Sequence, residues 1–220
     1  SLTRRWRRFV SALKLPPAAR YAEWIAIFSE SRRASLYTDA FLATLPDSDP
    51  IEWLADAFHD AGTRDLLTRT SLADLVTYLP CDLMTKVDMA SMANSLECRQ
   101  PLLDHRLVEL AIETPIDHKF RHGRGKRVLK EAFGHLLPPG VLKRRKMGFG
   151  VPLDHWFRHE LSELAHQVLL DPSTVRRGFF REDAVARLLE EHQAGTFNHG
   201  YRLWALLVLE LWQREWIGTG

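Results

Sequence analysis

KVDMASMANSLECRQPLLD, residues 86–104, is the stretch that decides the fold of this 220-residue chain. Apolar side chains such as Met89, Met92 and Leu96 recur in it at helical spacing, so a helix is predicted from its first residues onward. Lys86 and Asp88 fall near the start of that helix. For these two charged residues, the sequence favours a structural role and an active-site role equally.

The second half of this stretch places the charges of Glu97, Arg99 and Asp104 around Pro101. Such charges beside many apolar residues need partners, because an unpaired buried charge costs several kcal/mol. We therefore expect an internal ion-pair network that fixes a turn between two helices, with support of a substrate site as the other interpretation. Asp104 is also expected to cap a helix over 104–113, since Asp is a good N-cap residue.

Helical periodicity dominates outside this stretch as well. Further helices are predicted over 21–27, 34–44, 124–137, 154–170, 182–193 and 201–216. Strand signals are almost absent, so the chain is predicted to be all-α as it stands, with a weak boundary near 45–50. The last helix is apolar almost all round, which predicts a place in the core, and the seven tryptophans are predicted to be core anchors.

Composition excludes several classes of protein. Apolar residues make up 45% and charged residues 26%, the net charge is +2, and no run of about 18 apolar residues indicates a membrane span. The first ten residues, SLTRRWRRFV, lack the apolar run of a secretory signal, and a start at Ser1 is typical of a fragment. Cys81 and Cys98 make no disulfide framework, so buried free thiols and a cytoplasmic location are expected.

Positive charge concentrates between residues 119 and 146, where ten Lys and Arg stand against one acid, Glu131. Gly123 and Gly125 allow the backbone to approach a ligand closely, and Lys126 follows in the first turn of a predicted helix, where free N–H groups favour a phosphate. The pattern is not a Walker loop, because Arg127 stands where Ser or Thr would hold magnesium. A solvated loop, a nucleic-acid surface and a site for the phosphates of ATP all remain open.

A third block, KRRKMGFGVP at 143–152, follows the basic segment. Lys146 and the glycines after it predict equally well a lid over phosphates and a structural turn. His155 and His159 are i, i+4 neighbours on a predicted helix, but no third ligand lies within reach, so zinc binding is not favoured.

Together, the three blocks KVDMASMANSLECRQPLLD, GRGK at 123–126 and KRRKMGFGVP resemble, in order and spacing, the C-terminal part of the synthetase domain of glutamine-hydrolysing asparagine synthetases. Members of that family carry a pattern close to K-V-D-R-x-S-M-A-x-S-L-E-x-R-x-P-F-L-D. This chain departs from it with Met89 for Arg, Leu102 for Phe and Cys98 for Val. Met89 in place of Arg removes a positive charge beside the helix expected at the active site, so the identity of the substrate within the family is left open.

The resemblance implies a carbon–nitrogen ligase in which ATP and Mg²⁺ convert the side-chain carboxylate of aspartate to an acyl-adenylate, and ammonia then gives asparagine. Glutamine would supply the ammonia through a glutaminase domain of the same protein. The resemblance makes Lys126 the catalytic residue. It implies ATP or pyrophosphate binding for Gly123, Gly125, Lys146 and Lys86. It implies substrate-site or structural support for Asp88, Glu97, Arg99 and Asp104.

The resemblance also implies that residues 1–220 are the C-terminal helical portion of a larger α/β domain, whose parallel sheet and nucleotide-binding half would come from upstream. The Ser-Gly-Gly-x-Asp-Ser pyrophosphate loop of the family is absent from these residues. We therefore expect the chain to need residues outside it for ATP and Mg²⁺, and to be inactive alone. The alternative is a non-catalytic helical module that binds nucleic acid or a protein through residues 119–146.

Overall fold

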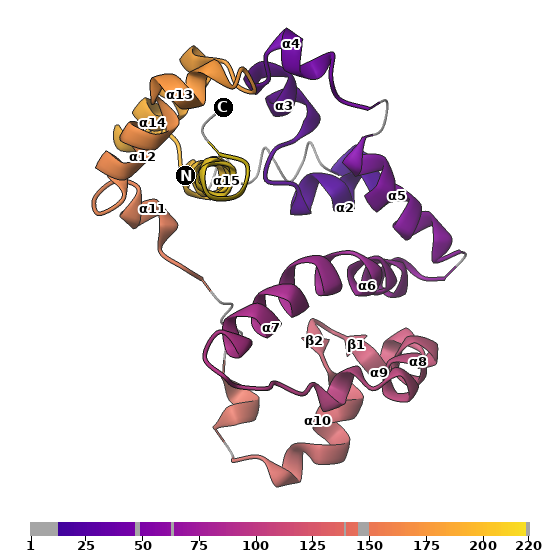
Figure 1. Ribbon diagram of the computed structural model, residues 1–220. Coiled ribbons are helices and arrows are strands. Elements are labelled where there is room, and N and C mark those ends of the chain that lie inside the picture. Colours follow the sequence, from indigo (N-terminus) through magenta and orange to yellow (C-terminus); the bar gives the residue numbers. More distant parts are fainter. Residues whose placement is uncertain (1–12, 47–48, 63, 139, 145–149, 219–220) are drawn as a thin grey trace. The chain divides into compact units, whose positions relative to one another are not determined.

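The computed structural model describes residues 13–46, 49–62, 64–138, 140–144 and 150–218 (Figure 1). These residues form helices joined by loops, with one two-stranded antiparallel hairpin, so the expectation of a mainly helical chain is confirmed. Along the sequence the chain divides into two compact units. The first takes in Ser1–Trp24 and Asp49–Lys146, and the second Ile25–Ser48 and Met147–Gly220.

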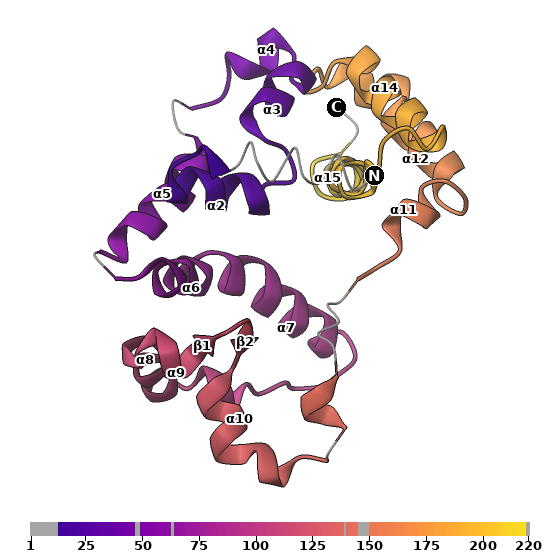
Figure 2. The same ribbon diagram turned by 180° about the vertical axis from the view of Figure 1, so that it is seen from behind.

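The first unit contains the stretch that decides the fold and the basic segment. Its elements, which Figure 2 shows from behind, are α2 (Pro17–Ile25), α5 (Pro50–Asp60), α6 (Leu66–Val76), a π-helix η1 (Leu79–Met84), α7 (Thr85–Met92), η2 (Pro101–Leu103), α8 (His105–Glu113), α9 (Ile116–Lys119), β1 (Phe120–Arg121), β2 (Arg124–Gly125), α10 (Arg127–Phe133), η3 (Gly134–Leu136) and η4 (Val141–Lys143).

A small core holds α2, α5 and α6 together in this unit. Phe58 of α5 is fully buried, and its ring lies 6.0 Å from the ring of Tyr21 on α2. The Tyr21 hydroxyl donates a hydrogen bond of 2.8 Å to Asp74 on α6. Burial raises the pKa of Tyr21 to about 12, so the hydroxyl keeps its proton and its bond at neutral pH.

Beyond these three helices the first unit buries almost nothing of its own. From Tyr78 to Arg144, none of the described residues is buried. Cys81 and Cys98 both lie in this part and are exposed, so the expectation of buried thiols is wrong. Sequence pattern predicts which side of a helix is apolar, but burial also requires another element to cover that side.

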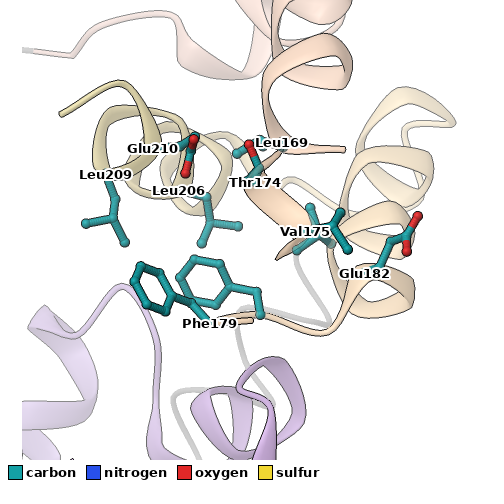
Figure 3. A pocket seen from close by; sticks show the side chains of 10 residues that line it. Leu169, Thr174, Val175, Phe179, Glu182, Leu206, Leu209 and Glu210 are labelled. Atoms are coloured by element: carbon teal, nitrogen blue, oxygen red, sulfur yellow. The ribbon is translucent and has the colours of Figure 1, made fainter. Parts of the chain in front are cut away.

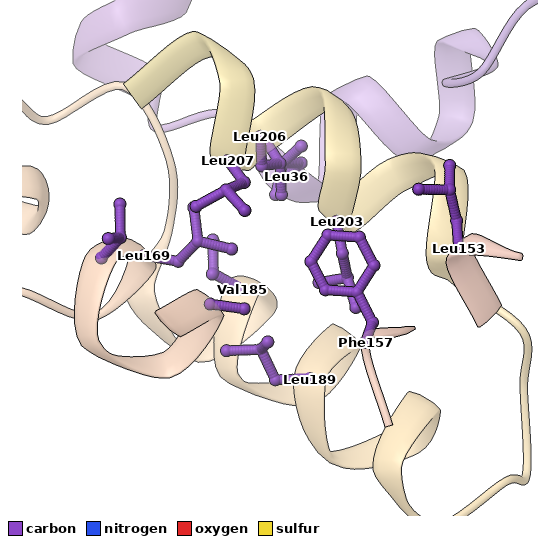
Figure 4. Packing of buried hydrophobic residues seen from close by; sticks show 11 residues of the cluster. Leu36, Leu153, Phe157, Leu169, Val185, Leu189, Leu203, Leu206 and Leu207 are labelled. Atoms are coloured by element: carbon purple, nitrogen blue, oxygen red, sulfur yellow. The ribbon is translucent and has the colours of Figure 1, made fainter. Parts of the chain in front are cut away.

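The second unit has a continuous hydrophobic core. Its helices are α3 (Glu30–Leu36), α4 (Asp39–Leu42), α11 (Leu153–Trp156), α12 (Ser162–Leu169), α13 (Pro172–Arg176), α14 (Glu182–Gln193) and α15 (Gly200–Trp216). Figure 4 shows Leu203, Leu206 and Leu207 of α15 facing Leu169 of α12 and Val185 of α14. Helix α15 therefore organises the packing of this unit.

Helix α15 lies in the core as expected, but only one of its sides is buried although the helix is apolar almost all round. Trp204 and Trp212 on its other side are 41% and 48% exposed. Trp24, Trp53 and Trp216 are exposed as well, so the prediction of tryptophan core anchors is wrong for these five. Trp156 is half-buried and packs against the core, and Trp6 lies outside the described residues. No described helix is both long and apolar enough to cross a membrane.

Local signals predicted several helices closely and failed at three places. The helices at 104–113, 182–193 and 201–216 are confirmed as α8, α14 and α15. The predicted helix 154–170 is broken after Trp156, where the Leu161 amide bonds to the Trp156 carbonyl at 2.7 Å. The predicted helix 34–44 is broken at Tyr37, which takes an extended conformation and pairs with Phe180. Residues 124–137 begin with a strand instead of a helix.

A buried ion-pair network ties α13 and the following turn to α15. Glu210 is 4% exposed, and its carboxylate accepts bonds of 3.0 Å from Arg177 and 2.9 Å from Arg214. The cavity beside Glu210, drawn in Figure 3, measures about 20 Å³, which is room for about one water molecule and too small for a substrate.

The Glu210 network predicts a large loss of stability when its negative charge is removed. Glu210→Gln keeps the shape of the side chain but leaves Arg177, which is 11% exposed, without a counter-charge. We expect the free energy of unfolding in urea to fall by about 3 kcal/mol. The matched control is Asp183→Asn, which breaks the exposed pair with Arg187 and is expected to cost less than about 0.5 kcal/mol. Equal losses in the two variants would contradict this account.

The fully buried His192 joins α14 to two other segments of the second unit. Its Nδ1 accepts a hydrogen bond of 2.9 Å from the His199 amide, so the ring proton sits on Nε2, which donates to the Asp154 carbonyl at 3.1 Å. Protonating Nδ1 would remove the acceptor. Burial lowers the pKa of His192, and burial likewise lowers the pKa of His199.

These lowered pKa values predict a loss of stability in mild acid. Below the ordinary histidine pKa of 6.5 the unfolded chain binds protons that the folded chain does not, so the free energy of unfolding falls as the pH drops from 6.5 towards 5. Urea unfolding at several pH values measures this slope. His192→Asn keeps an acceptor for the His199 amide and should reduce the slope of the free energy of unfolding against pH. The control His135→Gln changes an exposed histidine and should leave that slope unchanged.

Candidate functional site

The basic segment is built on a hairpin with the tightest kind of connection. In it Phe120 pairs with Gly125 and Arg121 with Arg124, so two residues form the turn. His122 and Gly123 both have positive φ, 48° and 74°, which is typical of a type I′ turn and suits the twist of the strands. Gly123 is thus explained by the backbone conformation that the turn requires.

Lys126 stands where the hairpin becomes helix α10. Its backbone is left-handed, with φ 57° and ψ 39°, and it occupies the N-cap position. A non-glycine residue in this region costs about 1 kcal/mol, so the local fold alone does not favour lysine here. The side chain is exposed, and it makes no hydrogen bond or ion pair within the described part of the chain.

Two other cations of the segment have structural partners. Arg127 donates to the Asp117 carbonyl at 2.7 Å and pairs with Glu131 at 2.9 Å, which holds the first turn of α10 against α9. Lys119 donates to Thr68 and to the Ile112 carbonyl, both at 3.1 Å. Arg127 and Lys119 therefore anchor the hairpin to the rest of the first unit.

An open hollow of about 770 Å³ lies between the hairpin and α10. Its lining residues are Arg121, His122, Arg124, Gly125, Arg127, Lys130 and Glu131. Glu131 is paired with Arg127, and no ion pair or hydrogen bond engages the side chains of Arg121, Arg124 and Lys130 among the described residues. Three uncompensated cations around one hollow create a positive potential that attracts a multiply charged anion.

The donor set of this hollow fits a polyphosphate. Guanidinium groups bind phosphate oxygens through two parallel hydrogen bonds, and lysine adds a compact charge. Helix α10 has seven residues, against the fourteen predicted for 124–137, so side chains carry the charge of the site rather than a long helix. At Gly125 an added Cβ would lie 3.8 Å from the Phe120 ring, an ordinary contact, so packing inside the chain does not require glycine there.

The first block lies on α7 and the extended segment after it. Lys86 pairs with Asp82 one helical turn earlier at 3.3 Å, and both are exposed, as is Asp88. Glu97 and Arg99 pair at 2.7 Å, but their side chains are 67% and 84% exposed. The expected internal network is therefore an exposed pair, and exposed pairs contribute little stability because water screens them.

Asp104 acts as the helix cap that the sequence predicts. Its carboxylate accepts a hydrogen bond of 3.0 Å from the Arg106 amide at the start of α8. The Arg106 guanidinium also bonds to it and holds the pKa of Asp104 below its ordinary range. Asp104 is thus a structural residue in the described chain.

The structure brings Gly123, Gly125 and Lys126 together at the hairpin. No hydrogen bond or ion pair links the charged residues of the first block to the hairpin within the described ranges, and Lys146 lies outside them. Sequence reasoning counted Arg121, Arg124 and Lys130 in the basic segment but did not single them out. The available signal was Gly123, since the second central residue of a type I′ turn needs a positive φ and glycine takes it without steric cost.

No group of three or more His, Cys, Asp and Glu side chains is arranged to hold a metal ion among the described residues. The rings of His155 and His159 lie 4.3 Å apart, but His159 follows the end of α11 and the two do not share one helix.

Comparisons with known proteins agree with the motifs of the sequence. The model of the asparagine synthase family matches residues 1–214. Asparagine synthetase (glutamine-hydrolysing) 1 of Bacillus subtilis is 30% identical over 155 residues, which are 70% of this chain and 24% of that protein. A Mycobacterium bovis protein provisionally named as a glutamine-hydrolysing asparagine synthetase is 35% identical over 169 residues, which are 76% of this chain and 26% of that protein.

Another match covers less of the chain. The asparagine synthetase of Bos taurus is 32% identical over 90 residues, which are 38% of this chain and 16% of that protein. No solved structure gives a significant match. The chain spans about a quarter of the length of the Bacillus subtilis and Mycobacterium bovis relatives.

The left-handed backbone at Lys126 predicts an unusual stability pattern. Lys126→Gly should be more stable than Lys126→Ala by about 1 kcal/mol in urea unfolding, because only glycine takes a positive φ without steric cost. The matched pair is Lys130→Gly and Lys130→Ala inside α10, where the order should reverse by about 1 kcal/mol. If the alanine variant is the more stable one at both positions, the backbone of Lys126 is not left-handed in solution.

Proposed function

The chain belongs to the asparagine synthase family, and on that premise we propose that it supplies the phosphate-binding helical part of an ATP-dependent ligase that makes asparagine from aspartate. The observation that carries this proposal is the hollow between the hairpin and α10. Its cations Arg121, Arg124 and Lys130 lack partners among the described residues, and Lys126 stands in the chain between two of its lining residues, Gly125 and Arg127. Triphosphate and pyrophosphate carry several negative charges, which these cations would attract.

In the proposed reaction, a carboxylate oxygen of aspartate attacks the α-phosphorus of ATP, and pyrophosphate leaves. Ammonia then attacks the acyl carbon, AMP leaves with the bonding electrons of the broken acyl–oxygen bond, and the nitrogen loses a proton as the amide of asparagine forms. Lys126 would stabilise the negative charge on the adenylate phosphate and on the oxyanion formed during the second attack. Arg121, Arg124 and Lys130 would hold the departing pyrophosphate, and Gly125 would let its oxygens come close to the backbone.

The other block residues take secondary roles in this proposal. Lys86 and Asp88 would face the ligand from α7, and Lys146, which lies outside the described residues, would add a positive charge for phosphate binding. Mg²⁺ would neutralise charge on the phosphates, and its protein ligands would come from residues other than the described ones, since no described cluster of side chains is arranged to hold it.

Exposed apolar surface on α7, η2, α8 and η3 supports the proposal that another part of the same protein covers this unit. Met89, Leu102, Leu110 and Leu136 are each between 64% and 69% exposed. Exposed apolar side chains in such number are typical of a surface that another element covers. We propose that the cover is the upstream nucleotide-binding half of an α/β synthetase domain, with a glutaminase domain supplying ammonia in the cytoplasm.

The rival interpretation, a non-catalytic module that binds nucleic acid or a protein, also draws on the basic hollow. Family membership does not favour it, and the hollow is small beside the long phosphate track that nucleic acid requires. Measuring RNA affinity at increasing salt concentration separates the two interpretations. A module that binds nucleic acid should bind RNA with an affinity that falls steeply as salt is added.

The proposal predicts the effect of removing the Lys126 charge in a full-length ligase that contains this chain. Lys126→Ala should lower asparagine synthesis by a factor on the order of 10²–10³, because a preorganised positive group is lost in the transition state. Glutamine hydrolysis should stay near its original rate, and the exposed Lys14→Ala should change neither activity. Steady-state assays of both activities measure this.

Loss of both activities in Lys126→Ala would point to misfolding, and unchanged synthesis would contradict the proposed role. The 220 residues alone serve as a second control. Aspartate-dependent exchange of isotope between ATP and pyrophosphate by these residues would contradict the proposal that the site needs the rest of the ligase.

A further inference from the structure

The second unit contains a pocket of about 170 Å³ between α3, α14 and the start of α15. Its lining consists of apolar side chains, which we call the floor, and of polar side chains, which we call the wall. The floor consists of Phe28, Leu36, Ala184 and Leu188, and the wall of Arg32, Ser35, Arg187, His199 and Arg202. All these residues belong to the second unit, so the pocket does not depend on the proposed phosphate site.

Three guanidinium groups line this pocket, and no carboxylate does. One nearby acid, Asp183, pairs with Arg187 at 3.2 Å on the exposed surface of α14. Another, Glu191, accepts a hydrogen bond of 2.7 Å from His199. Arg32 makes no side-chain hydrogen bond or ion pair within the described residues. The wall of the pocket therefore carries a net positive charge.

His199 fixes the position of one of these cations. The imidazole is 6% exposed, and its Nδ1 accepts a hydrogen bond from Arg202, so its proton sits on Nε2 and is donated to Glu191. Burial lowers the pKa of His199, the bond to Glu191 opposes this, and the charges of Arg202 and Arg32 lower the pKa further. The charges of Arg202 and Arg32 therefore both act on the buried His199 imidazole.

We propose that this pocket binds a small organic carboxylate. Arg32 and Arg202 would hold the carboxylate oxygens, and the carbon body would rest on the floor formed by Phe28 and Leu188. A carboxylate fits the planar guanidinium groups, and an apolar body fits the floor better than a fully hydrated inorganic anion does. The inference rests on the second unit alone and stands whether or not the proposed ligase activity does.

Butyrate titration of the protein, followed through the His199 imidazole signals in NMR, tests this proposal. Ionic strength is held constant with sodium chloride. We expect a saturable shift with a dissociation constant of about 1 mM, and roughly tenfold weaker binding of acetate, because its chain lacks two methylene groups that would reach the floor.

Arg202→Gln and Arg32→Gln should each weaken butyrate binding at least about tenfold. Arg176→Gln removes an exposed charge of the same unit that does not line the pocket, and it should leave binding unchanged. If Arg202→Gln fails to fold, Arg32→Gln decides, because the Arg32 side chain has no partner in the described structure.

Three results would overturn the proposal. They are the absence of a saturable shift, wild-type affinity for butyrate in Arg32→Gln, and tighter binding of inorganic phosphate than of butyrate. The last result would mean that the pocket recognises charge alone.

Discussion

The register of one short hairpin determines where the cations of the candidate site lie. Pairing Phe120 with Gly125 leaves two residues for the turn and brings Arg121 opposite Arg124. The strand then ends, and the chain enters α10 through the left-handed Lys126. A shift of this register by one residue would move every one of these side chains to the other face of the hairpin. The hollow, its charge and the proposed role of Lys126 all depend on this arrangement.

The two units differ in how far they are completed by their own residues. The second unit has a buried core around α15 and a buried network at Glu210. In the first unit, no described residue from 78 to 144 is buried, although this part carries the candidate site. Structural cations such as Arg127 and Lys119 fix the hairpin locally through hydrogen bonds. This combination of a locally fixed site and uncovered apolar helices is what we expect of one part of a shared active site.

The sequence predicted what local chemistry determines. Asp104 was identified as a cap, and the helix 182–193 was predicted to the residue, because caps and helical period act within a few residues. Burial was predicted poorly for Cys81, Trp204 and the pair of Glu97 and Arg99, since it depends on which distant element covers each side chain. The hairpin was missed because strands of two residues show no period, and the role of Lys126 rests on the family motif and stays a prediction.

Protection of Lys126 by pyrophosphate tests the central claim most directly. In the full-length ligase, acylation of each lysine by a soluble active ester can be followed by mass spectrometry with and without pyrophosphate. We expect pyrophosphate to slow the acylation of Lys130, which lines the hollow, severalfold. Lys126, which stands in the chain between the lining residues Gly125 and Arg127, should be slowed as well, while the exposed Lys14, which does not line the hollow, reacts at an unchanged rate. Equal rates at Lys130 and Lys126 with and without pyrophosphate would contradict the assignment of this hollow as the phosphate site.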